Sequence, residues 1–122
     1  MIDKINIDEK FAKFSEHWRP KIVSELNGQE FKLVKIQGEY PWHAHADADE
    51  MFFIWKGEIT LEFRTHSVDL NAGEAIVVPM GVEHRPIAEN EAEIFLIEPK
   101  NVKNSGDADV DEKYDAPMDV WI

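Results

Sequence analysis

Three of the five histidines and one glutamate have the types and spacing of a metal-binding site. His43 and His45 are separated by one residue, so in a β-strand both side chains point to the same face. Glu50 follows at the start of an apolar run, and His84 comes after the turn sequence Pro79-Met80-Gly81. A turn of this form would direct the following strand back toward the histidine pair. The candidate metal ligands are therefore His43, His45, Glu50 and His84.

Three imidazole rings and one carboxylate form a mixed N/O ligand set. This set suits Fe(II), Mn(II), Ni(II), Co(II), Zn(II) or Cu(II), does not suit Ca(II), and does not choose among those metals. Four protein ligands on an octahedral ion leave two positions for water or substrate, whereas a structural zinc site is closed. A carboxylate buried among apolar strands is costly without a cation beside it, which favours metal binding by Glu50. The alternative is a metal-free, hydrogen-bonded polar cluster.

Short β-strands must position these residues. From about residue 20 to 99 the sequence shows short apolar or alternating runs, separated by Gly and Asn turn residues. This pattern predicts an all-β sandwich or barrel. Asn27-Gly28 is a typical two-residue hairpin turn, and Gly57 lies where a tight hairpin needs a positive φ. The expected strands contain the runs Ile22–Leu26, Phe31–Ile36, Met51–Trp55, Ile59–Arg64, Ala75–Val78 and Ile94–Ile97.

Two segments resemble the conserved motifs of the cupin superfamily. Residues 38–57 read GEYPWHAHADADEMFFIWKG, and residues 73–84 read GEAIVVPMGVEH. The family motifs are G(X)5HXH(X)3–4E(X)6G and G(X)5PXG(X)2H(X)3N. The four candidate ligands, Gly57, Gly73, Pro79 and Gly81 match them at the family spacing. The sequence departs from the motifs at Gly38, which lies one residue too close to His43, and at Ala88, which replaces the terminal Asn.

The resemblance implies a cupin jelly-roll β-barrel, a double-sheet sandwich, formed by residues 1–122 as a single domain. The barrel core is expected at about residues 20–99, with a short N-terminal helix at about 6–16, capped by Asn6 or Asp8. The extended C-terminal tail, residues 100–122, is expected to wrap the barrel and dock through Trp121, or else to be partly disordered. The whole pattern is similar to short bacterial cupins of the RmlC-like, mannose-6-phosphate-isomerase-like type, a label that implies no isomerase activity.

Strand alternation predicts which residues surround the site. Phe52 and Ile54 share a face with Glu50 and should line an apolar pocket. Tyr40 and Trp42 are expected on the face opposite His43, in outer packing, in a dimer interface or at the barrel mouth. The second face of the 51–55 strand is also apolar, so it must be covered by the N-terminal helix or by another subunit. We favour a homodimer.

The resemblance leaves the reaction open, because the cupin fold hosts dioxygenases, isomerases, decarboxylases, sugar-binding regulators and storage proteins. The first hypothesis is a metal-dependent oxygenase or isomerase that acts on a small organic molecule. The sequence nominates no catalytic acid or base besides the ligands. The alternative is a non-catalytic cupin that binds or senses a small metabolite, such as a sugar or a carboxylate. A third hypothesis is a structural dimer with an empty barrel.

Composition excludes several other functions. The chain has 25 acidic and 13 basic residues and a net charge of −12, which would repel nucleic acids and anionic membranes. No apolar run approaches the roughly 18 residues of a membrane span. The acidic N-terminus lacks the apolar region of a signal peptide, so a cytoplasmic location is expected. Without cysteine there are no disulfides, Cys-ligated metals or thiol nucleophiles.

Overall fold

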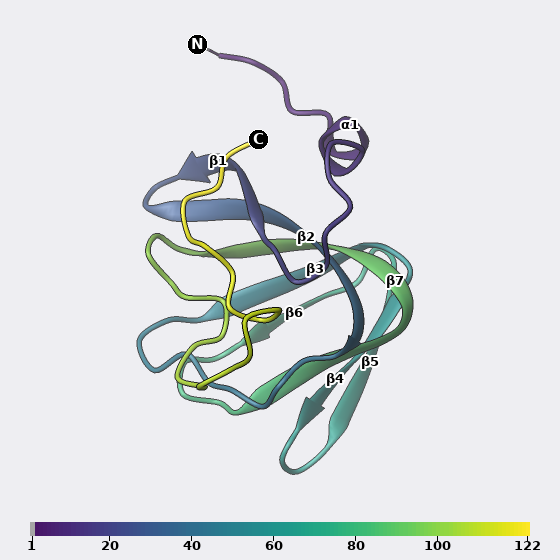
Figure 1. The fold of residues 1–122 in the computed structure, drawn as a ribbon, viewed down its shortest axis with the longest axis vertical. Coiled ribbons are helices and arrows are strands. Elements are labelled where there is room, and N and C mark those ends of the chain that lie inside the picture. Colours follow the sequence, from purple (N-terminus) through teal and green to yellow (C-terminus); the bar gives the residue numbers. More distant parts are fainter. Residues whose placement is uncertain (1) are drawn as a thin grey trace.

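The computed structural model describes residues 2–122, which fold into seven antiparallel strands and one short helix (Figure 1). The helix is α1 (Ile7–Phe11), and the strands are β1 (Lys21–Leu26), β2 (Gln29–Glu39), β3 (Glu50–Lys56), β4 (Glu58–Phe63), β5 (Ser67–Asn71), β6 (Ala75–Val78) and β7 (His84–Pro99). The strands close into a jelly-roll β-barrel, as the sequence predicted.

The long strand β7 joins the two layers of the barrel. Its C-terminal part lies between β2 and β3 in the strand order β1-β2-β7-β3-β6, and its first residues pair with β4, which in turn pairs with β5. The sequence predicted only the segment Ile94–Ile97 of this strand. It missed the rest because glutamates at positions 89, 91 and 93 interrupt the apolar pattern. The whole of β5, which is mostly polar, was missed for the same reason.

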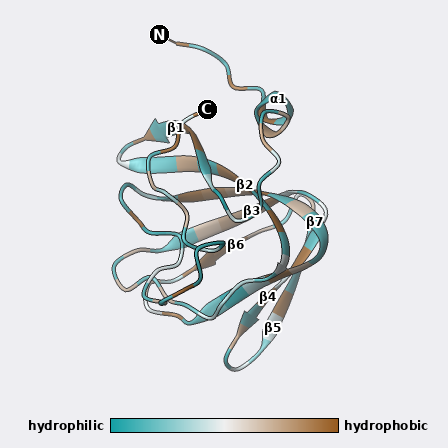
Figure 2. Ribbon diagram, viewed as in Figure 1, coloured by the Kyte–Doolittle hydropathy of each residue, from teal (hydrophilic) through white to brown (hydrophobic). Residues whose placement is uncertain are grey.

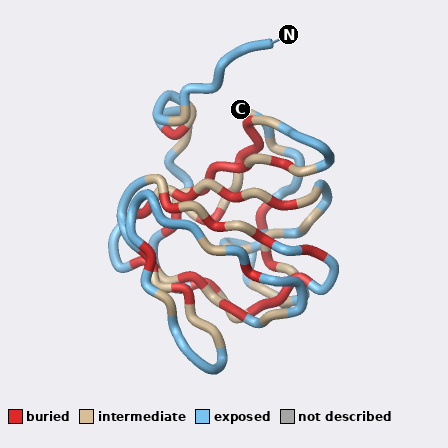
Figure 3. Tube along the Cα trace, turned by 180° about the vertical axis from the view of Figure 1, so that it is seen from behind, coloured by how far each residue is buried: buried red, intermediate tan, exposed pale blue. Residues whose placement is uncertain are grey.

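The barrel interior is filled by alternate residues of the central strands. In β3, Glu50, Phe52 and Ile54 are buried, whereas the residues between them are partly exposed. Figure 2 shows hydrophobic segments along the strands, and Figure 3 shows that exposure is concentrated in the loops and the N-terminal end. The predicted inward orientation of Phe52 and Ile54 is therefore confirmed.

Two tight turns fix the strand register. Asn27 and Gly28 have φ values of 52° and 81° and connect β1 to β2 as a two-residue hairpin. Gly57 has a φ of 87°, and a side chain there would lie 3.2 Å from the Ala92 backbone of β7. Glycine is required at this position both by its backbone conformation and by the close approach of β7.

The helix is shorter than the predicted range 6–16. Asn6 caps it, since its side chain accepts a hydrogen bond of 3.0 Å from the Glu9 N–H. It ends at Phe11, and the chain that follows forms hydrogen bonds with β2. There the Trp18 N–H donates to the Lys35 carbonyl (2.9 Å), and Lys35 Nζ donates to the Phe14 carbonyl (2.7 Å).

The N-terminal segment covers part of the outer sheet face. Phe11 packs there in a cluster with buried Val23 and Leu33 and with partly buried Trp55. The Trp55 indole N–H also donates to Asp8 at 2.7 Å. The N-terminal helix thus covers one end of the second apolar face, which was one of the two alternatives.

The C-terminal segment, residues 100–122, contains no helix or extended strand. It runs from the end of β7 across the barrel and back to β1 (yellow in Figure 1). It docks there through its backbone, because the Ile22 N–H donates to the Val120 carbonyl (2.7 Å) and the Ile122 N–H to the Ile22 carbonyl (3.1 Å). The Trp121 side chain itself is 50% exposed, so the ring is not the anchor. Between residues 2 and 122, no helix has the length and apolar character needed to cross a membrane.

Candidate metal centre

The backbone brings the three candidate histidines together. The His43 N–H donates to the His84 carbonyl at 3.1 Å, and the His84 N–H donates to the His43 carbonyl at 2.9 Å. Gly81, with a φ of 80°, donates its N–H to the His45 carbonyl at 2.8 Å. The turn before His84 therefore fixes that histidine against the pair on the other segment, as its sequence suggested.

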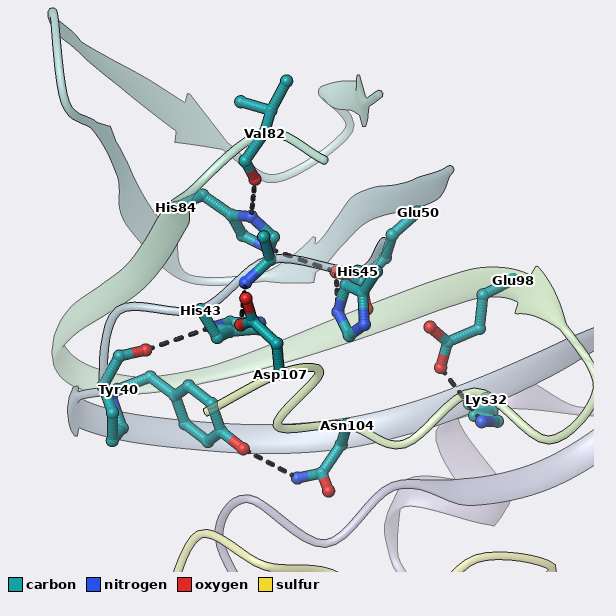
Figure 4. A network of polar contacts seen from close by, with 12 residues as sticks. Lys32, Tyr40, His43, His45, Glu50, Val82, His84, Glu98, Asn104 and Asp107 are labelled. Atoms are coloured by element: carbon teal, nitrogen blue, oxygen red, sulfur yellow. Dashed lines mark hydrogen bonds and ion pairs between the residues drawn. The ribbon is translucent and has the colours of Figure 1, made fainter. Parts of the chain in front are cut away.

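Two of the rings are oriented by backbone carbonyls. His43 Nδ1 lies 3.0 Å from the Pro41 carbonyl oxygen, and His84 Nδ1 lies 2.8 Å from the Val82 carbonyl oxygen (Figure 4). A carbonyl can only accept, so in the neutral rings Nδ1 carries the proton. Each Nε2 then presents a lone pair to the cluster, which is the tautomer that metal-ligating histidines adopt.

Glu50 completes the cluster at the start of β3. Its Oε1 lies 3.4 Å from Nε2 of both His45 and His84, which is longer than an ordinary hydrogen bond. His43, His45, Glu50 and His84 are all buried, and their ligand atoms lie within 4.8 Å of one another. The structure thus brings together all four residues that the sequence singled out.

The buried polar atoms of this cluster fit a metal ion. His45 Nε2, Glu50 Oε1 and His84 Nε2 have no hydrogen-bond partner among residues 2–122, although buried polar atoms are nearly always paired. Ligand atoms about 2.1 Å from an ion are roughly 3–4 Å from one another. The two 3.4 Å separations from Glu50 Oε1 to the histidines fall in this range, and all four ligand atoms lie within 4.8 Å of one another. The cluster could therefore hold a divalent metal ion, and the geometry does not reveal which one.

The electrostatics of the cluster favour a charged carboxylate and a neutral His43. Burial opposes ionisation of Glu50, but the facing His45 and His84 outweigh it and hold the Glu50 pKa well below its usual value. Burial, followed by the proximity of His84, lowers the pKa of His43 to about 4. Burial also disfavours the charged form of His45, but Glu50 raises its pKa overall. A ligand set with an ionised glutamate and neutral imidazole is the form that binds cations.

A cavity of about 40 Å³ lies beside the cluster, with His43 and Glu50 in its wall. Its other lining residues are mainly apolar: Trp18, Pro20, Val34, Ile36, Tyr40, Phe52, Pro86, Ile94, Leu96 and Asn104. An apolar wall with a few polar groups at one end is typical of sites that bind small organic molecules.

Comparison with known proteins decides the family. The Cupin domain family matches residues 30–98, which is more than half of the chain and includes all four clustered residues. The chain belongs to the cupin family.

Two similar proteins with solved structures come from bacteria. A cupin-2 domain protein of Shewanella frigidimarina is 47% identical, with a TM-score of 0.78 over 79% of this chain and 94% of that chain. Protein NMB1881 of Neisseria meningitidis is 36% identical, with a TM-score of 0.74 over 80% of this chain and 100% of that chain. Among curated relatives, the uncharacterised protein YdbB of Bacillus subtilis is 35% identical over 65% of this chain and 65% of its own length.

Two more distant proteins have names that mention a reaction. The candidate dioxygenase SSO1533 of Saccharolobus solfataricus is 27% identical over 51% of this chain, and the chain spans only 16% of its length. The hydroquinone 1,2-dioxygenase PnpCD, solved with Cd²⁺ and 4-hydroxybenzonitrile, is 20% identical, with a TM-score of 0.67 over 75% of this chain and 70% of that chain. At this identity the second likeness shows the fold alone.

One predicted orientation in this cupin was wrong. Tyr40 was expected on the face opposite His43, but its ring is buried in the barrel, 5.0 Å from the His43 ring between centroids. Alternation failed because β2 ends at Glu39 and Pro41 then redirects the chain. Trp42 does lie outside the barrel, where the Arg64 guanidinium lies 3.9 Å from its ring centroid.

The C-terminal segment supplies contacts that the sequence did not reveal. Tyr40 Oη donates to the Tyr114 carbonyl (2.8 Å) and accepts from Asn104 Nδ2 (3.0 Å). Asp107 bonds the backbone of Ala44 through its Oδ1 (2.9 Å). In sequence these tail residues look like an acidic, solvated terminus, and only the aromatic Tyr114 signals packing.

A buried charged triad was also missed. Glu30, Lys32 and Glu98 are each less than 10% exposed, and Lys32 Nζ lies 2.9 Å from Glu98 Oε1 and 3.6 Å from Glu30 Oε1. The register that pairs Met51 with Ile97 places Glu98 beside Glu50 on the inward face. Burial, followed by the Glu50 charge, raises the pKa of Glu98 to about 8, although Lys32 opposes the shift.

We expect Glu98 to make stability fall as the pH rises. Because its pKa rises from 4.5 in the unfolded chain to about 8 on folding, the folded state binds the proton more tightly between these values. Its contribution is complete below pH 4.5 and is lost as the pH passes 8. Urea unfolding of chelator-treated protein at pH 5 and pH 8 should show that wild type loses about 1 kcal/mol or more relative to Glu98→Gln. The control variant Glu89→Gln, at an exposed site, should show the same pH dependence of stability as wild type. The same pH dependence in all three proteins would contradict the role assigned to Glu98.

Proposed function

We propose that this cupin is a metal-dependent enzyme, an oxygenase or isomerase that acts on a small organic molecule in the barrel cavity. His43, His45, Glu50 and His84 would hold one divalent ion: Fe, Mn, Ni, Zn or Cu. The proposal is carried by one observation: unpartnered Nε2 and Oε1 atoms converge at the wall of an apolar cavity. Four protein ligands leave open positions on an octahedral ion, as a catalytic site requires.

Each part of the site has a defined role in this proposal. When bound, the ion would supply Lewis-acid or redox chemistry. The Pro41 and Val82 carbonyls hold the rings of His43 and His84 in the ligating tautomer. The apolar lining binds the body of the substrate and excludes water, which strengthens electrostatic interactions in the cavity. Burial, followed by the Glu50 charge, raises the pKa of Tyr40, so its hydroxyl stays neutral beside the substrate.

Dioxygenase chemistry has the stronger support of the two reactions. The candidate dioxygenase SSO1533 matches part of this chain, and PnpCD, a dioxygenase solved with Cd²⁺ and an aromatic ligand, shares its fold. The largely aliphatic and aromatic lining here suits a planar or otherwise apolar body with one polar end at the ion.

The alternative is a cupin that binds or senses a small metabolite, such as a sugar or a carboxylate, without converting it. The cavity lining favours this alternative in one respect: besides the candidate ligands His43 and Glu50, its only titratable side chain is Tyr40. A reaction that needed a separate general base would therefore find none in the lining.

Metal analysis combined with turnover assays tests the proposal. Untagged protein, purified without chelator or nickel resin, is analysed by ICP-MS. It is then reconstituted with each candidate metal and assayed for oxygen uptake and product formation on small phenols, enols and carboxylic acids. Stoichiometric metal with turnover supports the enzyme. Metal with saturable binding and no product supports the alternative, and failure of every metal to bind overturns the site.

We also propose that this cupin forms a homodimer through the outer face of β3 and its neighbours. Val77 is 55% exposed, and the register places it beside Met51, which in turn lies beside Ile97. Together with Phe53, these residues form an apolar strip beyond the cover of α1. Light scattering should give the mass of two chains for wild type and of one chain for Met51→Glu. A wild-type mass of one chain would contradict the dimer.

A further inference from the structure

The C-terminal segment holds the backbone between two candidate ligands. Ala44 lies between His43 and His45, and its N–H donates to Asp107 Oδ1 at 2.9 Å. Its carbonyl accepts the Asp107 N–H at 3.0 Å. Both polar backbone groups of Ala44 are thus held by one residue, far away in sequence, which Figure 4 shows beside the histidines.

Gly106 allows the segment to approach this closely. Its φ is 56°, and a Cβ added there would clash with the Ala44 carbonyl oxygen and lie 2.9 Å from the carbonyl carbon. The same Cβ would be 3.2 Å from His45 Nδ1. Any side chain at position 106 would therefore push the segment away from Ala44 and the His45 ring.

His45 depends on this contact more than the other histidines do. The rings of His43 and His84 are oriented by the Pro41 and Val82 carbonyls, whereas no hydrogen bond to His45 Nδ1 is found within the described part of the chain. The direction of the His45 ring is then determined by its backbone and by the segment packed against it. A fixed ligand direction is what pre-organises a metal site.

The segment itself is weakly anchored. Of residues 101–122, only Ser105 and Ala116 are buried, so little apolar surface holds the segment in place. Its attachment relies on hydrogen bonds, such as those from the Arg19 guanidinium to the Glu112 and Asp115 carbonyls, and on the partly buried side chains of Tyr114 and Ile122. Elements with few buried apolar contacts open at low free-energy cost.

We propose that Asp107 is a positioning residue of the metal centre, through which the C-terminal segment clamps the His43–His45 segment and slows metal release. This inference rests on the proposed metal site. It extends that site to a part of the chain that contributes no ligand, and it links metal retention to attachment of the segment.

The rate of metal release tests the clamp. The protein is loaded with Co(II), whose visible absorption reports ligand geometry, and release into excess chelator is followed by the loss of that absorption. Asp107→Ala should release Co(II) about 10–100-fold faster than wild type, the range seen when support of a ligand is lost. Asp107→Asn should restore a rate near that of wild type, because its amide oxygen can still accept from Ala44.

Two further variants separate the clamp from general destabilisation. Gly106→Ala displaces the same contact sterically and should also speed release and alter the Co(II) spectrum. Asp109→Ala removes an exposed carboxylate of the same segment and should behave as wild type. Wild-type release rates in both Asp107→Ala and Gly106→Ala would overturn the clamp alone, as would equally fast release from Asp109→Ala. A wild-type protein that binds no Co(II) would overturn the metal site, and the clamp with it.

Discussion

Replacing both His45 and His84 by alanine should abolish metal binding by this cupin. Four-ligand zinc sites bind with about 10–16 kcal/mol, so each ligand contributes about 3 kcal/mol, or on the order of 100-fold in affinity. Loss of two ligands should therefore weaken binding by on the order of 10⁴-fold. ICP-MS should find near-stoichiometric metal in wild type and about a tenth of that or less in the double variant.

The matched control replaces the two histidines that lie outside the cluster. His17 pairs with Glu91 at 2.7 Å on the surface, and the ring of His66 stacks on Phe63 with a centroid distance of 5.0 Å. The variant His17→Ala/His66→Ala has the same histidine count as the ligand variant and should keep its metal. Equal metal loss in both variants would mean that the metal is bound elsewhere, and full retention in the ligand variant would refute the ligand set.

The clustering of the four candidate ligands was predictable because it depends on residues that are close together in the sequence. His43 and His45 are only two residues apart in the connection between β2 and β3, where His43 pairs with His84, and the turn Pro79-Met80-Gly81 brings His84 to the same point. Such information is local, so it is present in a single sequence. The fold class was predictable for a similar reason, since alternating runs and Gly turns are local signals.

The contacts made by the C-terminal segment were not predictable. Asn104 contacts Tyr40 through one hydrogen bond and Asp107 contacts Ala44 through two, and such contacts leave no apolar pattern in the sequence. Tyr40 was misplaced because a period of two is meaningful only inside a strand, and β2 ends one residue before it. The burial of the charged residues was not predicted for a different reason. Glu30 and Lys32 look like the solvent face of a strand, but in a closed barrel their face is the interior.

These buried charges lead to the second large effect. Lys32→Met should destabilise the protein by about 3–5 kcal/mol, because removal of one partner leaves a buried carboxylate without its cation. Lys32 Nζ is 2.9 Å from Glu98, whose side chain is fully buried. The destabilisation should be larger at pH 8 than at pH 6. Burial already raises the pKa of Glu98 to about 8, so at pH 6 the carboxyl binds a proton and a neutral group is buried instead of an unpaired charge. Urea unfolding of chelator-treated protein at the two pH values measures this difference.

A second substitution should restore much of the loss. In Lys32→Met/Glu98→Gln the buried charge is removed together with its partner, and replacing both members of a buried pair is often close to neutral. The double variant should also lose the difference between pH 6 and pH 8, since no titrating carboxyl remains at position 98. Glu30, whose Oε1 lies 3.6 Å from Lys32, is present in both variants, so any destabilisation that persists reports the loss of its contact with Lys32. If the double variant is as unstable as Lys32→Met and shows the same pH difference, Glu98 is not the group that depends on the lysine.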